Sequence, residues 1–206
     1  AAKDGVNTLG RLYDISELPG KRGAGRSVRV LKLSPKDDLR YEYRLYLDRE
    51  SKLLMRSEVY SPKGEVLENV GFKEISFEPA LLENPALQKA GPGWISSSTE
   101  VRVMGKDELS YDLPDLAFGF KKADTVCRVK GKEEQIHQTV YSDGLSTLSV
   151  FIQKSQPGQS MPQVPMSHGA VMSMSATQGK HMVTVLGEVP EKTLELFLKS
   201  VRWKSQ

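Results

Sequence analysis

Few residues of this 206-residue chain combine a reactive side chain with the spacing that catalysis or metal binding needs. The three histidines, His137, His168 and His181, stand apart, and none has a second ligand at a metal-site spacing such as H-x-x-x-H. We therefore expect each to have a surface or packing role. The single cysteine, Cys127, can form neither an intrachain disulfide nor a thiolate metal site, so we expect a small buried side chain there.

Residues 20–26 form a short basic segment rich in glycine. The segment lacks the G-x-x-x-x-G-K-[ST] order of a nucleotide-binding loop, and it precedes a predicted strand rather than a helix. We interpret it as a flexible basic loop. Its cations, Lys21, Arg22 and Arg26, are candidates for contact with an anionic partner such as a phospholipid or lipopolysaccharide head group.

Four aspartates, Asp37, Asp38, Asp112 and Asp115, are candidates for acid–base pairs by residue type. Nothing in the sequence places them in a pocket, so we expect turn residues. We predict no catalytic residue, no metal ligand and no cofactor. The chain is therefore interpreted as a binding protein, with an enzyme as the least favoured class.

Composition limits the class of partner. Hydrophobic residues make up 38% of the chain, enough for a core in one domain or two. The 29 basic and 26 acidic residues leave a net charge of only +3, so nucleic acid is not implied. No stretch approaches the roughly 20 apolar residues of a membrane-spanning helix, so we expect the chain as given to be soluble.

The first third of the chain predicts an antiparallel meander. Predicted strands cover residues 28–33, 41–47, 53–59 and 66–77, and the turns between them contain proline, glycine and aspartate. Alternation in residues 41–47 predicts one buried face. Because such short connections can join only antiparallel neighbours, we expect one antiparallel sheet.

The later part predicts a smaller α+β unit. Residues 78–98 lose the alternation and read as an interdomain connection, and residues 156–165 as a long, mobile loop. Hairpins are predicted at 138–151 and 170–186. A final helix begins near Pro190, and its apolar residues at i, i+3, i+4 and i+7 form one stripe that should pack on the sheet. These residues are Leu194, Phe197, Leu198 and Val201.

Several segments together resemble the MucB/RseB family of envelope-stress regulators. They are RSVRVL (26–31), DLRYEYRLYLD (38–48), LMRSE (54–58), GEVLE (64–68), LPDLAFGF (113–120), YSDGLSTLSV (141–150) and LGEVPEKT (186–193). The fifth is similar to the family's W-L-P-x-G-F stretch. Tyr111 and Ala117 depart from the family pattern, so local packing is expected to differ there. The order and spacing of the segments cover nearly the whole chain from about Leu12.

The resemblance implies a fold and a function. We expect residues 1–78 to be the later half of an N-terminal β domain resembling a LolA-type half-barrel, residues 79–98 a linker, and residues 99–206 a C-terminal α+β domain. Because family members carry a longer N-terminal domain, the chain is expected to be a fragment. The implied protein is periplasmic, binds the periplasmic region of a membrane-spanning anti-sigma factor of the MucA/RseA type, and shields it from proteolysis.

Four aromatic residues are candidates for contact with the partner. Phe118, Phe120, Tyr141 and Phe151 are candidate partner contacts, because aromatic anchors dominate many interfaces, although a core role is the preferred interpretation of each. The alternative function is a periplasmic carrier of lipid, lipopolysaccharide or lipoprotein, which uses the apolar face of the first sheet. The sequence leaves homo-oligomerisation and the releasing signal open.

Overall fold

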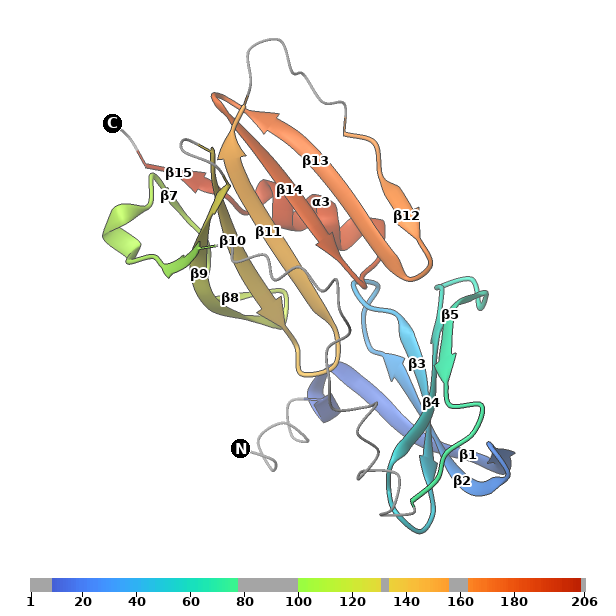
Figure 1. Cartoon of the computed structure of the whole chain (residues 1–206). Coiled ribbons are helices and arrows are strands. Elements are labelled where there is room, and N and C mark those ends of the chain that lie inside the picture. Colours follow the sequence, from blue (N-terminus) through green and yellow to red (C-terminus); the bar gives the residue numbers. More distant parts are fainter. Residues whose placement is uncertain (1–8, 78–99, 131–133, 156–162, 205–206) are drawn as a thin grey trace, which may run out of the picture.

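The computed structural model describes residues 9–77, 100–130, 134–155 and 163–204. Within these ranges, two large antiparallel sheets form the body of the molecule, and a helix packs against the second of them (Figure 1). The predicted α+β class, with antiparallel sheets and a C-terminal helix, is confirmed. The predicted linker at 79–98 and most of the predicted loop at 156–165 lie outside the described residues.

The first sheet is a meander in which each strand pairs with the next along the chain. Its described strands are β1 (Tyr13–Gly23), β2 (Arg26–Pro35), β3 (Glu42–Asp48), β4 (Leu54–Tyr60) and β5 (Val66–Gly71). The predicted strands from residue 28 onward are present, but β5 ends at Gly71 and not at residue 77. The β4–β5 register ends at Gly71, opposite Arg56, and the Phe72 amide still donates to the Met55 carbonyl at 3.0 Å.

The prediction of a flexible basic loop at residues 20–26 was wrong. Residues 20–23 complete β1, and Arg26 begins β2. Ala24 and Gly25 form the turn between them, with φ of +48° and +78°, as expected for a two-residue hairpin turn. Strand β1 could not be predicted from the sequence, because this edge strand is largely polar and lacks an alternating apolar pattern.

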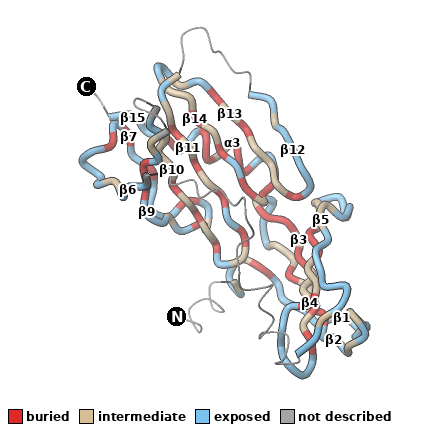
Figure 2. The backbone as a smooth tube through the Cα atoms, viewed as in Figure 1, coloured by how far each residue is buried: buried red, intermediate tan, exposed pale blue. Residues whose placement is uncertain are grey.

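Both faces of the first sheet carry buried side chains, and Figure 2 marks the buried residues along β3 and β4 in red. On one face Tyr13, Tyr43 and Val59 pack with Ala170 of the second sheet's region. On the other, Val28 and its neighbours form a separate cluster that includes Tyr46, which is only 5% exposed. The expectation of a single buried face for residues 41–47 was therefore incomplete.

The second sheet comprises eight described strands. Its order is β12 (Met166–His168), β13 (Val171–Gln178), β14 (His181–Gly187), β11 (Thr147–Lys154), β10 (Glu134–Ser142), β9 (Phe120–Lys130) and β6 (Glu100–Val103), with β8 (Leu116–Ala117) also paired to β9. The predicted hairpins are β10–β11 and β13–β14. Beside the sheet lie a 3₁₀ turn, η2 (Lys106–Glu108), and a short ladder of β7 (Tyr111–Asp112) with β15 (Arg202–Trp203).

Helix α3 (Glu191–Lys199) covers one face of the second sheet (Figure 1). Its predicted stripe is buried: Leu194, Phe197 and Leu198 are at most 2% exposed. Val201, predicted on the same stripe, follows the end of the helix and is 8% exposed. These side chains share a core with the inward residues of β10, β11, β13 and β14. The helix therefore stabilises the sheet by burying its apolar stripe, as its periodicity predicts.

Candidate functional site at the junction of the two sheets

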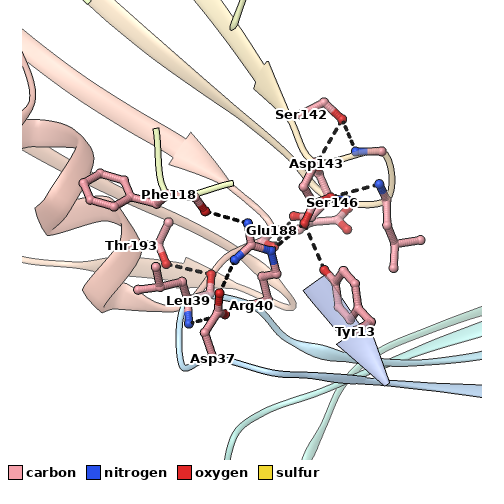
Figure 3. Close-up of polar contacts among 12 residues, drawn as sticks. Tyr13, Asp37, Leu39, Arg40, Phe118, Ser142, Asp143, Ser146, Glu188 and Thr193 are labelled. Atoms are coloured by element: carbon pink, nitrogen blue, oxygen red, sulfur yellow. Dashed lines mark hydrogen bonds and ion pairs between the residues drawn. The ribbon is translucent and has the colours of Figure 1, made fainter. Parts of the chain in front are cut away.

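The two sheets meet at a buried ion pair. Arg40 lies between β2 and β3, and Asp143 lies in the turn between β10 and β11 (Figure 3). Arg40 Nε donates to Asp143 Oδ2 at 2.8 Å, and neither side chain is exposed to solvent. Desolvated charges are tolerated only when they are paired and hydrogen-bonded. This contact therefore fixes the position of one sheet relative to the other.

Hydrogen bonds within the β10–β11 turn hold the carboxylate of Asp143 in position for the ion pair. Its Oδ1 accepts hydrogen bonds from the backbone amides of Leu145 at 2.9 Å and Ser146 at 2.7 Å, and Gly144 supplies a φ of +98°. Tyr13 of β1 donates its hydroxyl to Asp143 Oδ2 at 3.1 Å. Burial, followed by the Asp143 charge, raises the pKa of Tyr13 well above its ordinary value, so the phenol remains a neutral donor.

Arg40 also reaches two further segments. Its Nη1 donates to Asp37, and its Nη2 donates to the carbonyl oxygen of Phe118 at 2.7 Å. The guanidinium lies 4.4 Å from the centre of the Phe120 ring. The planar fork of arginine allows these contacts at once, which a lysine cannot reproduce. One side chain of the first sheet thus holds two turns of the second.

Polar contacts between α3 and residues 38–39 reinforce the junction. Thr193 Oγ1 donates to the carbonyl of Leu39 at 2.7 Å, and Lys192 pairs with Asp38 (Figure 3 shows the first contact). The helix is therefore fixed to the first sheet as well as to its own.

The turn between β8 and β9 has an unusual backbone. Phe118 and Gly119 have φ of +52° and +82°. A Cβ at Gly119 would come within 2.6 Å of Arg40 Nη2, so the close approach of the arginine requires glycine there. A bulky residue such as Phe118 rarely adopts a positive φ. Its ring packs edge-on against Phe197, with 5.7 Å between ring centres, and remains 42% exposed.

A groove with a cavity volume of about 500 Å³ lies beside Phe118. It runs between residues 112–118 and residues 196–202, which extend from the end of α3 into β15. The apolar lining residues are Leu113, Pro114, Leu116, Ala117, Phe118 and Leu196, and the polar ones are Asp112, Lys199, Ser200 and Arg202. This volume is in the range of small binding pockets in proteins.

The four aromatic residues named as partner contacts have different positions. Phe120 and Tyr141 are completely buried, and their rings lie against Phe197 at 5.8 and 4.8 Å. Phe118 borders the groove. Phe151 alternates with the buried Val150 and Ile152, so it lies on the sheet face opposite to α3 and is half-buried. The structure therefore gives two of these residues a packing position and leaves Phe118 and Phe151 accessible.

The three basic candidates also differ. Arg22 is exposed. Arg26 pairs through two hydrogen bonds with Asp48 and through one with Glu50 at 2.7 Å, so its guanidinium is engaged within the fold. Lys21 belongs to β1, but its side chain lies outside the described part of the chain.

The other reactive side chains take part in packing. Tyr111 shares a hydrogen bond with His137, His181 stacks on Trp203, and Cys127 is buried and free of disulfide. His168 is exposed on β12. Among the described residues, no group of three or more histidine, cysteine, aspartate or glutamate side chains is arranged to hold a metal ion.

The four aspartates also have assigned contacts. Asp37 and Asp38 lie in the β2–β3 connection and pair with Arg40 and Lys192. Asp115 pairs with Lys122 and Lys106, which lower its pKa, and Asp112 lies on β7. No helix in the described part of the chain is long and apolar enough to cross a membrane.

Sequence reasoning missed the residues that form the junction. Asp143 lies inside the predicted hairpin at 138–151, and Arg40 lies inside one of the segments that resemble the family. No local sequence pattern indicates that Arg40 or Asp143 is buried, because the two residues are 103 positions apart along the chain.

Two family models match the chain, one after the other. Residues 1–90 match the MucB/RseB N-terminal domain, and residues 105–202 match the MucB/RseB C-terminal domain.

Two relatives illustrate the similarity. The sigma factor AlgU regulatory protein MucB of Pseudomonas aeruginosa is 29% identical over 202 residues, which cover 94% of this chain and 62% of that protein. The sigma-E factor regulatory protein RseB of Escherichia coli K12 is 26% identical over 197 residues, which cover 95% and 61%. The chain thus spans about three-fifths of the length of these relatives.

Solved structures show the same similarity in three dimensions. A crystal structure of MucB in complex with MucA(peri) matches 97% of this chain and 70% of the solved chain, with a TM-score of 0.74 and 26% identity. A crystal structure of MucB alone matches 96% of this chain and 66% of the solved chain, with a TM-score of 0.64 and 26% identity.

Proposed function

Because this chain belongs to the MucB/RseB family, we propose that it regulates an envelope-stress sigma factor by binding the periplasmic region of a membrane anti-sigma factor. In this proposal the chain acts in the periplasm and shields its partner from proteolysis. Its role is binding rather than catalysis, in keeping with the regulatory names of its relatives.

One observation carries the proposal. The match to MucB in complex with MucA(peri) extends over 97% of this chain, so it includes both large sheets and the junction between them. We also propose the division into residues 1–78, 79–98 and 99–206, which the separate matches at 1–90 and 105–202 support.

The direct test is calorimetric titration of this chain with the purified periplasmic region of the anti-sigma factor from the same organism. We expect saturable binding at concentrations below tens of micromolar, and slower cleavage of that region by the protease that normally cuts it. A partner fragment of the same composition in scrambled order is the control. Absence of binding at tens of micromolar would refute the proposal.

A lipid or lipoprotein carrier is the second candidate, and one feature of the first sheet favours it. The strand register places Leu31, Leu45 and Val70 on one face, where Val70 is 58% exposed, and Ile15 of the same sheet is 47% exposed. An apolar face of this kind suits acyl chains or an apolar partner surface. Mass spectrometry of co-purified lipid tests it: a stoichiometric acyl lipid would favour this candidate, and its absence would favour the protein partner.

A further inference from the structure

We propose that the groove beside Phe118 accepts a peptide segment in which an apolar side chain lies close to a carboxylate. The inference rests on the proposed function, because the peptide segment belongs to the anti-sigma partner. It identifies a surface of the second sheet's region and the chemistry of the partner that this surface fits.

Apolar residues make up most of the groove's lining. Six of the ten lining residues are apolar, and two of them are unusually accessible: Leu116 is 68% exposed and Phe118 is 42% exposed. Two large apolar side chains that border one cavity form a contiguous surface, which is more informative than scattered exposed residues. A cavity of about 500 Å³ has room for one or two partner side chains.

The backbone of Phe118 indicates that its ring is held in place for contact. Asparagine and glycine are the usual residues where a hairpin turn needs positive φ, and a phenylalanine there is strained. The turn persists because Arg40 holds the Phe118 carbonyl and Phe197 packs against the ring. A ring fixed in this way loses little entropy on binding, which is the main advantage of a pre-organised surface.

The charges around the groove favour an acidic partner. Arg202 is exposed and has no ion pair among the described residues, and the side chain of Lys199 is 71% exposed with only a 3.5 Å contact to Glu195. The one acidic lining residue, Asp112, already has Lys204 at 3.6 Å. The uncompensated charge beside the apolar lining is therefore positive, and it complements a carboxylate.

The strand pairing favours a peptide over a small molecule. Strand β8 pairs with β9 and with no other described strand. Both residues of β8, Leu116 and Ala117, line the groove. An unpaired strand edge can bind an extended peptide through main-chain hydrogen bonds.

The experiment compares groove variants in the calorimetric titration with the partner's periplasmic region. Arg202→Glu and Phe118→Gly change the charge and remove the ring, while glycine keeps the positive φ of the turn. We expect each to weaken binding by about 10-fold or more. Lys180→Glu makes the same charge change in the β13–β14 turn, and Val66→Ala truncates an exposed apolar residue of the first sheet. We expect both controls to bind within about 2-fold of the wild type.

Each outcome decides the matter. If the wild type binds and the groove variants bind equally well, the groove inference is wrong while the proposed function stands. If the wild type does not bind, both fail. Arg202→Gln and a thermal melt guard against a folding defect, and a lysine placed at the partner's acidic position should restore binding to Arg202→Glu. Failure of every acidic position to do so would exclude the assigned charge contact.

Discussion

Replacing Asp143 by alanine tests the junction between the sheets most severely. The substitution leaves the unexposed guanidinium of Arg40 without its carboxylate, and it removes the acceptor for Tyr13 and for two backbone amides. Breaking a buried pair from one side costs about 3 to 5 kcal/mol. Arg40 keeps Asp37 and the Phe118 carbonyl, so we expect a value near the lower end, about 3 kcal/mol.

Urea unfolding followed by far-UV circular dichroism measures this cost. A loss of about 3 kcal/mol corresponds to a melting temperature lowered by about 6 to 12 °C in a chain of this size. Asp143→Asn is the matched control, because the amide oxygen can still accept hydrogen bonds. In a double-mutant cycle with Arg40→Met, we expect a coupling energy of about 2 kcal/mol, since the double variant no longer contains a stranded charge.

The result that would refute this reasoning is specific. If Asp143→Ala costs less than about 1 kcal/mol, or if the two single costs add within about 0.5 kcal/mol, the ion pair does not fix the two sheets together. The junction would then depend on the apolar cluster around Tyr43 and Ala170 and on the contacts of α3 with residues 38–39.

Three further predictions concern single positions. Tyr13→Phe removes a donor from a buried carboxylate and should cost about 1.5 kcal/mol in urea unfolding, without altering the secondary structure seen by circular dichroism. Burial, and then the Glu68 charge, raise the pKa of Glu188, so its ionised form destabilises the fold. The free energy of unfolding therefore falls as pH rises above the unfolded-state pKa of this carboxyl group. Glu188→Gln should stabilise the protein at pH 7 and change its stability little at pH 3. A Cβ at Gly187 would lie 2.5 Å from Leu148 Cβ and 2.6 Å from the Thr147 carbonyl oxygen. Gly187→Ala should therefore lower the melting temperature, at a cost of about 2 to 3 kcal/mol. Gly10→Ala is the control, because a Cβ at Gly10 meets nothing within 4 Å, and it should leave the melting temperature unchanged.

Local signals account for the parts of the fold that the sequence predicted. A turn with proline and glycine at residues 61–64 follows β4, and an aspartate–glycine turn separates β10 from β11. The apolar stripe of α3 has the helical period. Strands β1 and β9 escaped prediction because their charged and polar residues disrupt the alternation. In a sheet, pairing with a neighbouring strand can stabilise such a segment, so its own pattern need not identify it.

Some features of the candidate site follow from local sequence, and others depend on the tertiary structure. The sequence by itself determined the hairpins, the helix and the segments that carry the family resemblance, since each depends on residues close together in the chain. The tertiary structure decided which aromatic residues are accessible: Phe120 and Tyr141 pack under α3, while Phe118 borders the groove. It also paired Arg40 with Asp143. A buried charge is stable only beside its partner, and that proximity arises from the folding of two separate sheets and not from any local pattern.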